Sequence, residues 1–133
     1  MDDRVREFLE KNHHGVMTTL KKDGTPHVAM IGMGLVDGKL WSSGTQTRVR
    51  TKHLRRDSRS TLMVLEKGNP YSWLALETTV TILDGDDAPQ LNLALYRVIT
   101  GKDPDDMDEY MQAMVDDERL IFEFHLLRAY GQY

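Results

Sequence analysis

Short stretches of apolar and β-branched residues, each ended by a turn signal, most constrain what this chain can fold into. Asp37-Gly38 separates two such stretches, and this pair is typical of a two-residue β-hairpin turn. Lys21–Gly24 and Lys67–Pro70 separate other stretches in the same way. Strands joined by hairpins pair antiparallel. The sequence therefore predicts an antiparallel sheet, and the absence of alternating strands and helices argues against a Rossmann domain.

The pattern predicts six strands and four helices. We expect the strands at Val16–Leu20, Pro26–Leu35, Lys39–Ser43, Ser60–Glu66, Tyr71–Leu83 and Arg119–Tyr130. We expect the helices at Asp3–Asn12, from a cap at Thr45 or Thr47 to about Arg56, at Ala88–Thr100 and at Asp105–Val115. A chain of 133 residues supports one hydrophobic core. The predicted fold is a single domain, residues 1–133, of the α+β class: mainly β, a small antiparallel barrel decorated by helices.

Composition excludes several kinds of site. The chain has no cysteine, so disulfides, thiolate metal sites and cysteine nucleophiles are absent. The charged start and the lack of long apolar runs predict a cytoplasmic protein with no membrane partner. The net charge of −4 disfavours nucleic acid as a partner. The five histidines lack ligand spacing, so we predict no metal. No catalytic side chains stand out; the catalytic residues stay unknown, and any catalysis would rest on a bound cofactor.

Cations gather in one short segment of this acidic chain. Residues 48–59, which we call the cationic segment, hold six Lys and Arg against one acid, Asp57. A strand ending in Ser43 and Thr45 precedes the segment, and a predicted helix starts within it. Helix N-termini attract anions, and threonine and arginine side chains add hydrogen bonds to them. The segment suits a phosphate, but a solvated basic helix face with a Ser/Thr cap explains the same composition.

Aromatic residues offer a second possible contact. Tyr71, Trp73, Tyr130 and Tyr133 could stack on a ring system, and Tyr71 and Trp73 share one strand face. Packing in a core or in a dimer interface is the other interpretation.

The cationic segment, with the sequence RVRTKHLRRDSR, resembles a helix-to-strand segment of the pyridoxamine-phosphate-oxidase-like flavin and deazaflavin oxidoreductases. The similarity is greatest to the branch of that family that uses coenzyme F420. Further stretches agree in order and bring the resemblance to nearly the whole chain: Gly15–Leu20 with Asp23–His27, Tyr71–Glu77, Leu95–Gly101, Tyr110–Val115 and Arg128–Gly131.

The resemblance implies a split β-barrel of the FMN-binding type that forms a homodimer with two cofactor sites between the subunits. The residues that resemble the family's phosphate and tail binders are Thr45, Arg48, Arg50 and Lys52. The ring would lie near His27, Ala29 and Met30, with Trp73 reaching in from the partner chain, and His53 is a further residue of the cofactor site. Four positions depart from the family pattern, one of them after Glu77, where Thr78 and Thr79 stand without the usual glycine. Arg50 replaces a lysine, His53 an asparagine and Ser58 a proline, and Arg50 can still bind phosphate bidentately.

The function implied is hydride transfer from reduced coenzyme F420 to an unidentified small organic acceptor. Two alternatives within the family remain open: an FMN-binding oxidoreductase, and a non-catalytic F420-binding or storage protein.

Overall fold

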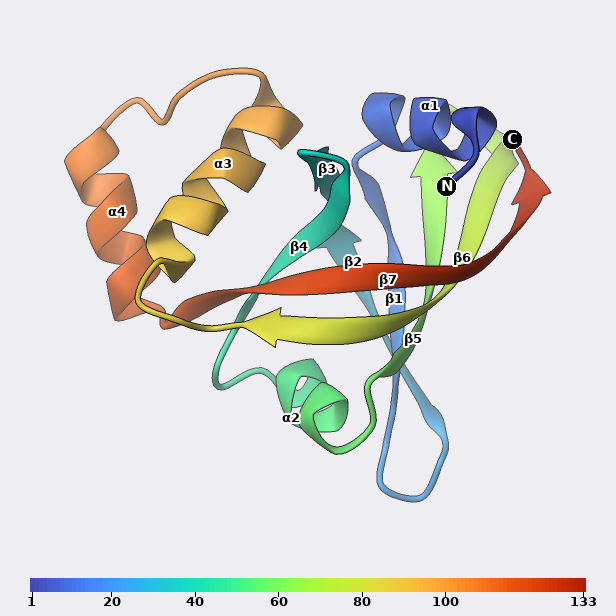
Figure 1. Ribbon diagram of the computed structural model, residues 1–133, viewed down its shortest axis with the longest axis horizontal. Coiled ribbons are helices and arrows are strands. Elements are labelled where there is room, and N and C mark those ends of the chain that lie inside the picture. The colour runs from blue at the N-terminus through green and yellow to red at the C-terminus, as the bar shows by residue number, and fades with distance from the viewer.

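The computed structural model describes residues 1–133 and contains seven strands and four helices. The helices are α1 (Asp3–Lys11), α2 (Val49–Arg56), α3 (Ala88–Thr100) and α4 (Met107–Asp116). The strands are β1 (His14–Leu20), β2 (Pro26–Gly32), β3 (Gly34–Val36), β4 (Lys39–Thr45), β5 (Arg59–Glu66), β6 (Asn69–Leu83) and β7 (Arg119–Gln132). They form one antiparallel sheet in the order β2-β1-β5-β6-β7-β4-β3. The long strands β6 and β7 run through both parts of the curled sheet (Figure 1).

The chain passes from one edge of the sheet to the other at Met33. Strand β2 ends before this residue at one edge, and β3 starts after it at the opposite edge. The amide of Met33 donates to the carbonyl of His13 at 2.8 Å, and His13 Nδ1 hydrogen bonds to the carbonyl of Met33 at 3.0 Å. The side chain of Met33 is fully buried. The prediction of one strand over Pro26–Leu35 is therefore wrong, because these contacts take Met33 out of the ladder and turn the sheet into a half-barrel.

The core fills the concave side of the sheet. It includes Leu62, Leu76 and Phe122, all without solvent exposure. Helix α1 adds Val5 and Leu9 from its apolar face and covers one end of the half-barrel (Figure 1). The predicted α+β class, mainly antiparallel β, is confirmed.

Helices α3 and α4 lie together at the other end of the molecule (Figure 1). The predicted helix Ala88–Thr100 is confirmed and ends at Gly101, whose φ of 74° is the left-handed conformation that favours glycine. The buried side chain of Asn92 donates to the carbonyl of Leu120 at 3.4 Å, and Ser43 Oγ donates to Asn92 Oδ1. These bonds join α3 to both β4 and β7.

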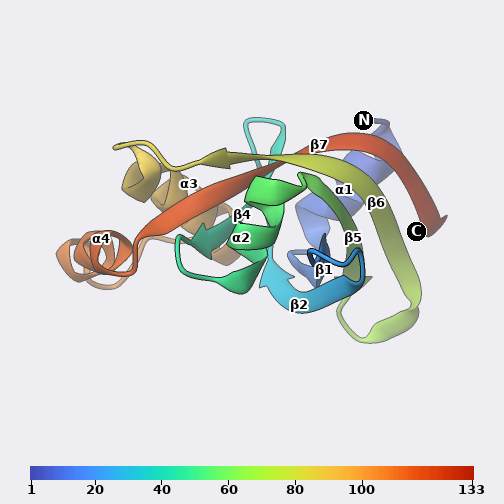
Figure 2. The ribbon, with the colours of Figure 1, turned by 90° about the horizontal axis from the view of Figure 1, so that it is seen from below.

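Helix α2 lies below the sheet, between the β4 side and the β1–β2 hairpin (Figures 1 and 2). It begins after Arg48, whose side chain makes no capping hydrogen bond. The predicted cap at Thr45 or Thr47 is wrong, because Thr45 belongs to β4 and its hydroxyl lies 3.4 Å from that of Thr47. None of the four helices combines the length and the apolar character needed to cross a membrane.

Candidate functional site

Three cations of the cationic segment are engaged by groups of the chain itself. Arg55 donates to Asp84 Oδ2 at 3.0 Å, and Arg59 donates to Asp57 Oδ2 at 2.7 Å. The hydrogen bonds from Arg59 lower the pKa of Asp57 to about 2. Arg56 donates to a backbone carbonyl at the end of β1. These three side chains therefore have partners without any ligand.

The other three cations, Arg48, Arg50 and Lys52, make no side-chain hydrogen bond and no ion pair; we call them the open cations. Arg48 and Lys52 are exposed, whereas Arg50 is partly buried and its Nε is buried without a partner. Burial lowers the pKa of Arg50, and repulsion from Arg48 and Arg119 lowers it further. Arginine nevertheless stays charged in proteins. The site therefore holds positive charge that the chain leaves unneutralised.

The open cations lie on the first turns of α2, which is open to an anion. No acidic residue occupies the first turn, and no side chain caps it. The first amides of a helix lack partners within the helix and carry the positive end of its dipole. Thr51 Oγ1 donates to the carbonyl of Thr45 at 2.6 Å, and this buried bond fixes the start of α2 against the end of β4. The free amides and the open cations therefore lie within the same short stretch, Arg48 just before α2 and Arg50 and Lys52 inside it, and such a stretch attracts anions.

Arg119 also belongs to this neighbourhood, and reasoning from the sequence missed it. It opens β7 and pairs in register with Thr45. Its Nε is buried without a hydrogen-bond partner, and the nearest carboxylate, that of Asp117, lies 3.9 Å away. The sequence did carry one sign: Arg119 is the first cation after the acidic run that ends at Glu118.

His27 and His53 meet between β2 and α2. Their rings lie edge to face with centroids 5.3 Å apart, and His53 Nδ1 shares a hydrogen bond of 2.9 Å with Thr19 Oγ1. Burial lowers the pKa of His53, as do the nearby charges of His27, Arg56 and Lys21. His27 Nδ1 is buried without a partner. The two histidines therefore offer polar ring atoms near the start of β2.

The structure separates the remaining predicted site residues. Ala29 alternates with His27 on the inner face of β2, whereas Met30 lies on the outer face and is 64% exposed. Trp73 packs edge-on against Tyr130 with ring centroids 6.2 Å apart. Trp73 on β6 pairs with Leu65 on β5, which pairs with His14, the first residue of β1. The other end of β1 lies beside α2, roughly 20 Å away along the strand. Within one chain, Trp73 and the open cations are far apart.

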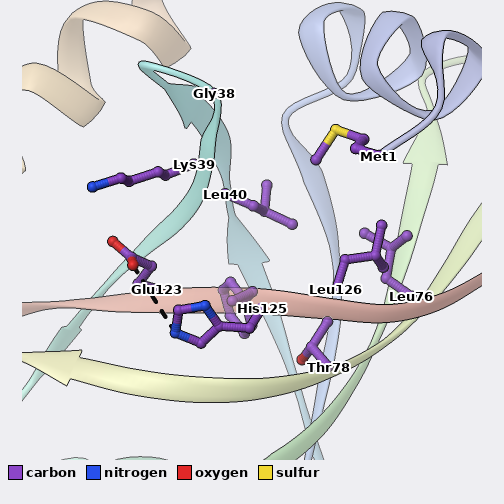
Figure 3. Close-up of a pocket in the computed structure, with 10 residues that line it drawn as sticks. Met1, Gly38, Lys39, Leu40, Leu76, Thr78, Glu123, His125 and Leu126 are labelled. Carbon is purple, nitrogen blue, oxygen red and sulfur yellow. Dashed lines mark ion pairs between the residues drawn. The ribbon is translucent and has the colours of Figure 1, made fainter.

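The cavity shown in Figure 3 contains none of the predicted cofactor residues. Its volume is about 390 Å³, and Leu40, Leu76 and Leu126 provide apolar walls. Glu123 accepts a hydrogen bond from Trp41 Nε1 at 2.8 Å and lies 4.0 Å from His125 Nε2. Lys39 at the rim of this cavity has no ion pair, but it is a single cation, whereas three open cations gather at α2.

The match to a known protein family shows which family this chain belongs to. The family described as pyridoxamine 5'-phosphate oxidase matches residues 1–133. The chain belongs to this family. Among curated proteins of the family, an F420H(2)-dependent biliverdin reductase of Mycobacterium tuberculosis (strain CDC 1551 / Oshkosh) is 30% identical over 88 residues. The match covers 66% of this chain and 64% of the relative, so the chain spans less than two thirds of that protein.

Solved structures of the family share the fold. A conserved hypothetical protein of Mycobacterium tuberculosis superposes with a TM-score of 0.81 at 19% identity, over 97% of this chain and 82% of the other. A structure described as an F420 reductase gives a TM-score of 0.73 at 21% identity, over 96% of both chains. These structures confirm the pyridoxamine-phosphate-oxidase-like fold that the resemblance implied.

Proposed function

We propose that the protein is an oxidoreductase that uses reduced coenzyme F420 to transfer hydride to a small organic acceptor in the cytoplasm. The observation that carries the proposal is the set of open cations at the uncapped start of α2, in a chain whose net charge is −4. The curated relative named as an F420H(2)-dependent reductase supports the same cofactor.

The residues at α2 fit the anionic part of F420, which carries a phosphodiester and a polyglutamate tail. Arg48 and Arg50 would hold the phosphodiester by charge-assisted hydrogen bonds, with Thr45 beneath them at the end of β4. Lys52 lies further along the helix, where the tail carboxylates can follow, whereas His53 faces Thr19 on β1 and His27 on β2. The exposed position of Lys52 suits a flexible, highly charged chain.

The ring is proposed to lie along β2. His27 Nδ1 has no partner in the chain and is available to a polar edge of the ring, and Ala29 next to it leaves room for an aromatic plane. The bound deazaflavin supplies the hydride chemistry, while the protein binds it, orients it and excludes water. No side-chain nucleophile is needed.

The outer sheet face supports a homodimer. Met30, Val16, Met63, Ala75 and Tyr130 form one row across five strands. In this row Met30 is 64% exposed, Met63 40% and Tyr130 40%. Ala75 within the row is buried, but the three exposed apolar side chains around it are of the kind that marks a contact surface. Trp73 lies on the same outer face as this row, two residues before Ala75 on β6.

The same phosphate site also suits FMN, so the test must compare the two cofactors. Purified protein is titrated in parallel with F420 and FMN, and oxidation of F420H2 is then followed by absorbance with a panel of organic acceptors. We expect tighter binding of F420 and acceptor-dependent oxidation. Tighter binding of FMN than of F420 would show that FMN is the cofactor. Binding of F420 without oxidation of F420H2 by any acceptor would indicate a storage protein.

A further inference from the structure

A cavity of about 140 Å³ lies between helices α3 and α4 and the strands β4 and β7, apart from the proposed cofactor site. Leu95 and Ile99 of α3 and Met114 of α4 give it a mostly apolar wall. An apolar protein cavity of about 150 Å³ is large enough to bind benzene. The space between α3 and α4 therefore holds one six-membered ring. None of the residues predicted to bind the cofactor lines it.

Helix α4 lies beside α3 without closing this space (Figure 1). Met107, Tyr110, Met111 and Met114 recur at helical spacing and are partly buried, but α4 has no fully buried side chain. Helix α3, in contrast, buries Leu95 almost completely. The apolar face of α4 thus keeps contact surface that a ligand in the cavity can cover.

Most polar side chains that line the cavity already have partners within the chain. Ser43 Oγ donates to Asn92 Oδ1, and Asn92 Nδ2 donates to a backbone carbonyl of its own helix at 3.0 Å. Thr100 Oγ1 donates to the carbonyl of Tyr96 at 2.8 Å. Arg119 differs from them, because its Nε is buried without a hydrogen-bond partner. The cavity therefore has an apolar wall with one unsatisfied cationic group.

Arg119 does form an ion pair, with Asp117, but the contact is weak. The distance from Nε to Oδ2 is 3.9 Å, beyond hydrogen-bond distance, and the Asp117 side chain is 54% exposed, so water screens the pair. Arg119 is the only cation that lines the cavity. A guanidinium group binds a carboxylate through two parallel hydrogen bonds. A ligand carboxylate at Arg119 would therefore make a closer contact than Asp117 does.

Two tyrosines favour an aromatic ligand. The rings of Tyr96 and Tyr110 line the cavity with centroids 5.1 Å apart, and Met114 lies in the same wall. Aromatic rings and thioether sulfur both pack favourably against a further ring. Burial raises the pKa of the Tyr110 hydroxyl, although the charge of Arg119 opposes this. The hydroxyl therefore stays protonated at neutral pH and can donate to an anion.

We propose that the cavity between α3 and α4 binds a small aromatic carboxylate, with its ring against Leu95, Ile99 and Met114 and its carboxylate on Arg119. The volume limits the ligand to one ring, and the single free cation limits it to one carboxylate. The site does not rest on the proposed function, because it shares no residue with the proposed F420 site.

Benzoate is the probe, and NMR titration of labelled protein reports both where it binds and how tightly. We expect saturable shifts that are largest at the methyl groups of Ile99 and Met114. Acetate lacks the ring, and benzyl alcohol lacks the carboxylate. Each should bind about tenfold more weakly than benzoate or worse, because each loses either the apolar contact or the charge-assisted hydrogen bonds.

Two substitutions at the carboxylate end should have opposite effects. Arg119→Gln should weaken benzoate binding about tenfold and leave benzyl alcohol binding unchanged, because only the carboxylate contact is lost. Asp117→Asn removes the competing acid and should strengthen benzoate binding about twofold or more. The matched control is Arg97→Gln, which removes the same charge from an exposed ion pair with Asp103. It should stay within about twofold of wild type.

Benzoate shifts centred on α2 rather than between α3 and α4 would overturn the proposal, as would equal losses in Arg119→Gln and Arg97→Gln. If Arg119→Gln does not fold, Asp117→Asn decides, and benzoate binding no tighter than in wild type would overturn the proposal. The proposed function fails separately: a protein that binds benzoate here but binds no F420 keeps this site and loses that function.

Discussion

In the cationic segment, Arg55, Arg56 and Arg59 are engaged by groups of the chain, whereas Arg48, Arg50 and Lys52 are open. Two double substitutions that remove the same amount of charge, one from each group, should therefore affect ligand binding differently. Arg48→Ala with Arg50→Ala removes two open cations. Arg55→Ala with Arg59→Ala removes two cations that the chain already pairs with Asp84 and Asp57. Both variants lose two positive charges from the same segment, so a difference between them reports on position rather than on total charge.

The magnitude follows from the contacts. Each charge-assisted hydrogen bond contributes about 1.5–3 kcal/mol, so loss of two weakens F420 binding by roughly a hundredfold to ten-thousandfold. The side chains of Arg48 and Arg50 make no hydrogen bond or ion pair within the chain, so the unfolding midpoint of that variant should not fall. The control variant should bind F420 nearly normally and lose a little stability, because exposed ion pairs stabilise only weakly.

Fluorescence titration of F420 and thermal unfolding followed by circular dichroism measure the two quantities on the same samples. Equal loss of binding in both double variants would show that only net charge matters, and would refute the distinction between open and engaged cations. Unchanged binding in Arg48→Ala with Arg50→Ala would remove the phosphate site itself.

Three further predictions concern the dimer, pH and packing. Met30→Asp should give a monomer by sedimentation velocity, because it puts a charge into the exposed apolar row; an unchanged dimer would contradict the role of that face. His53 has a pKa below its ordinary 6.5 in the folded chain, so the unfolded chain binds more protons below that pH and stability falls with acidification. His53→Asn should make the free energy of unfolding in urea less dependent on pH between pH 5 and 7. The same pH dependence as in wild type would refute the role of His53. Gly44→Ala should destabilise by about 1–3 kcal/mol in urea unfolding, because an added Cβ would lie 2.5 Å from the buried Phe122 ring; a stability equal to that of wild type would refute this.

Features with a local physical cause could be predicted from the sequence. Asp37 and Gly38 both have positive φ, as their hairpin turn requires. The helix from Ala88 to Thr100 follows from its apolar periodicity, its early proline and the glycine after it. Most of the other predicted ends of helices and strands differ from the observed ends by one or two residues, which is the usual uncertainty in such boundaries.

Features decided by contacts between distant residues could not be predicted. The break at Met33 depends on hydrogen bonds to His13, which local propensity does not encode. The position of Arg119 opposite Thr45 depends on the pairing of β7 with β4, a register that the sequence does not reveal. The candidate site was therefore found in part, through the residues that share a single helix.

A crystal structure of the protein with F420 bound tests the central claim most directly. We expect a phosphate oxygen within hydrogen-bond distance of the Arg50 guanidinium, with Arg48 at the same group or at the tail. A cofactor seated in the cavity of Figure 3, with both guanidinium groups facing solvent, would contradict it.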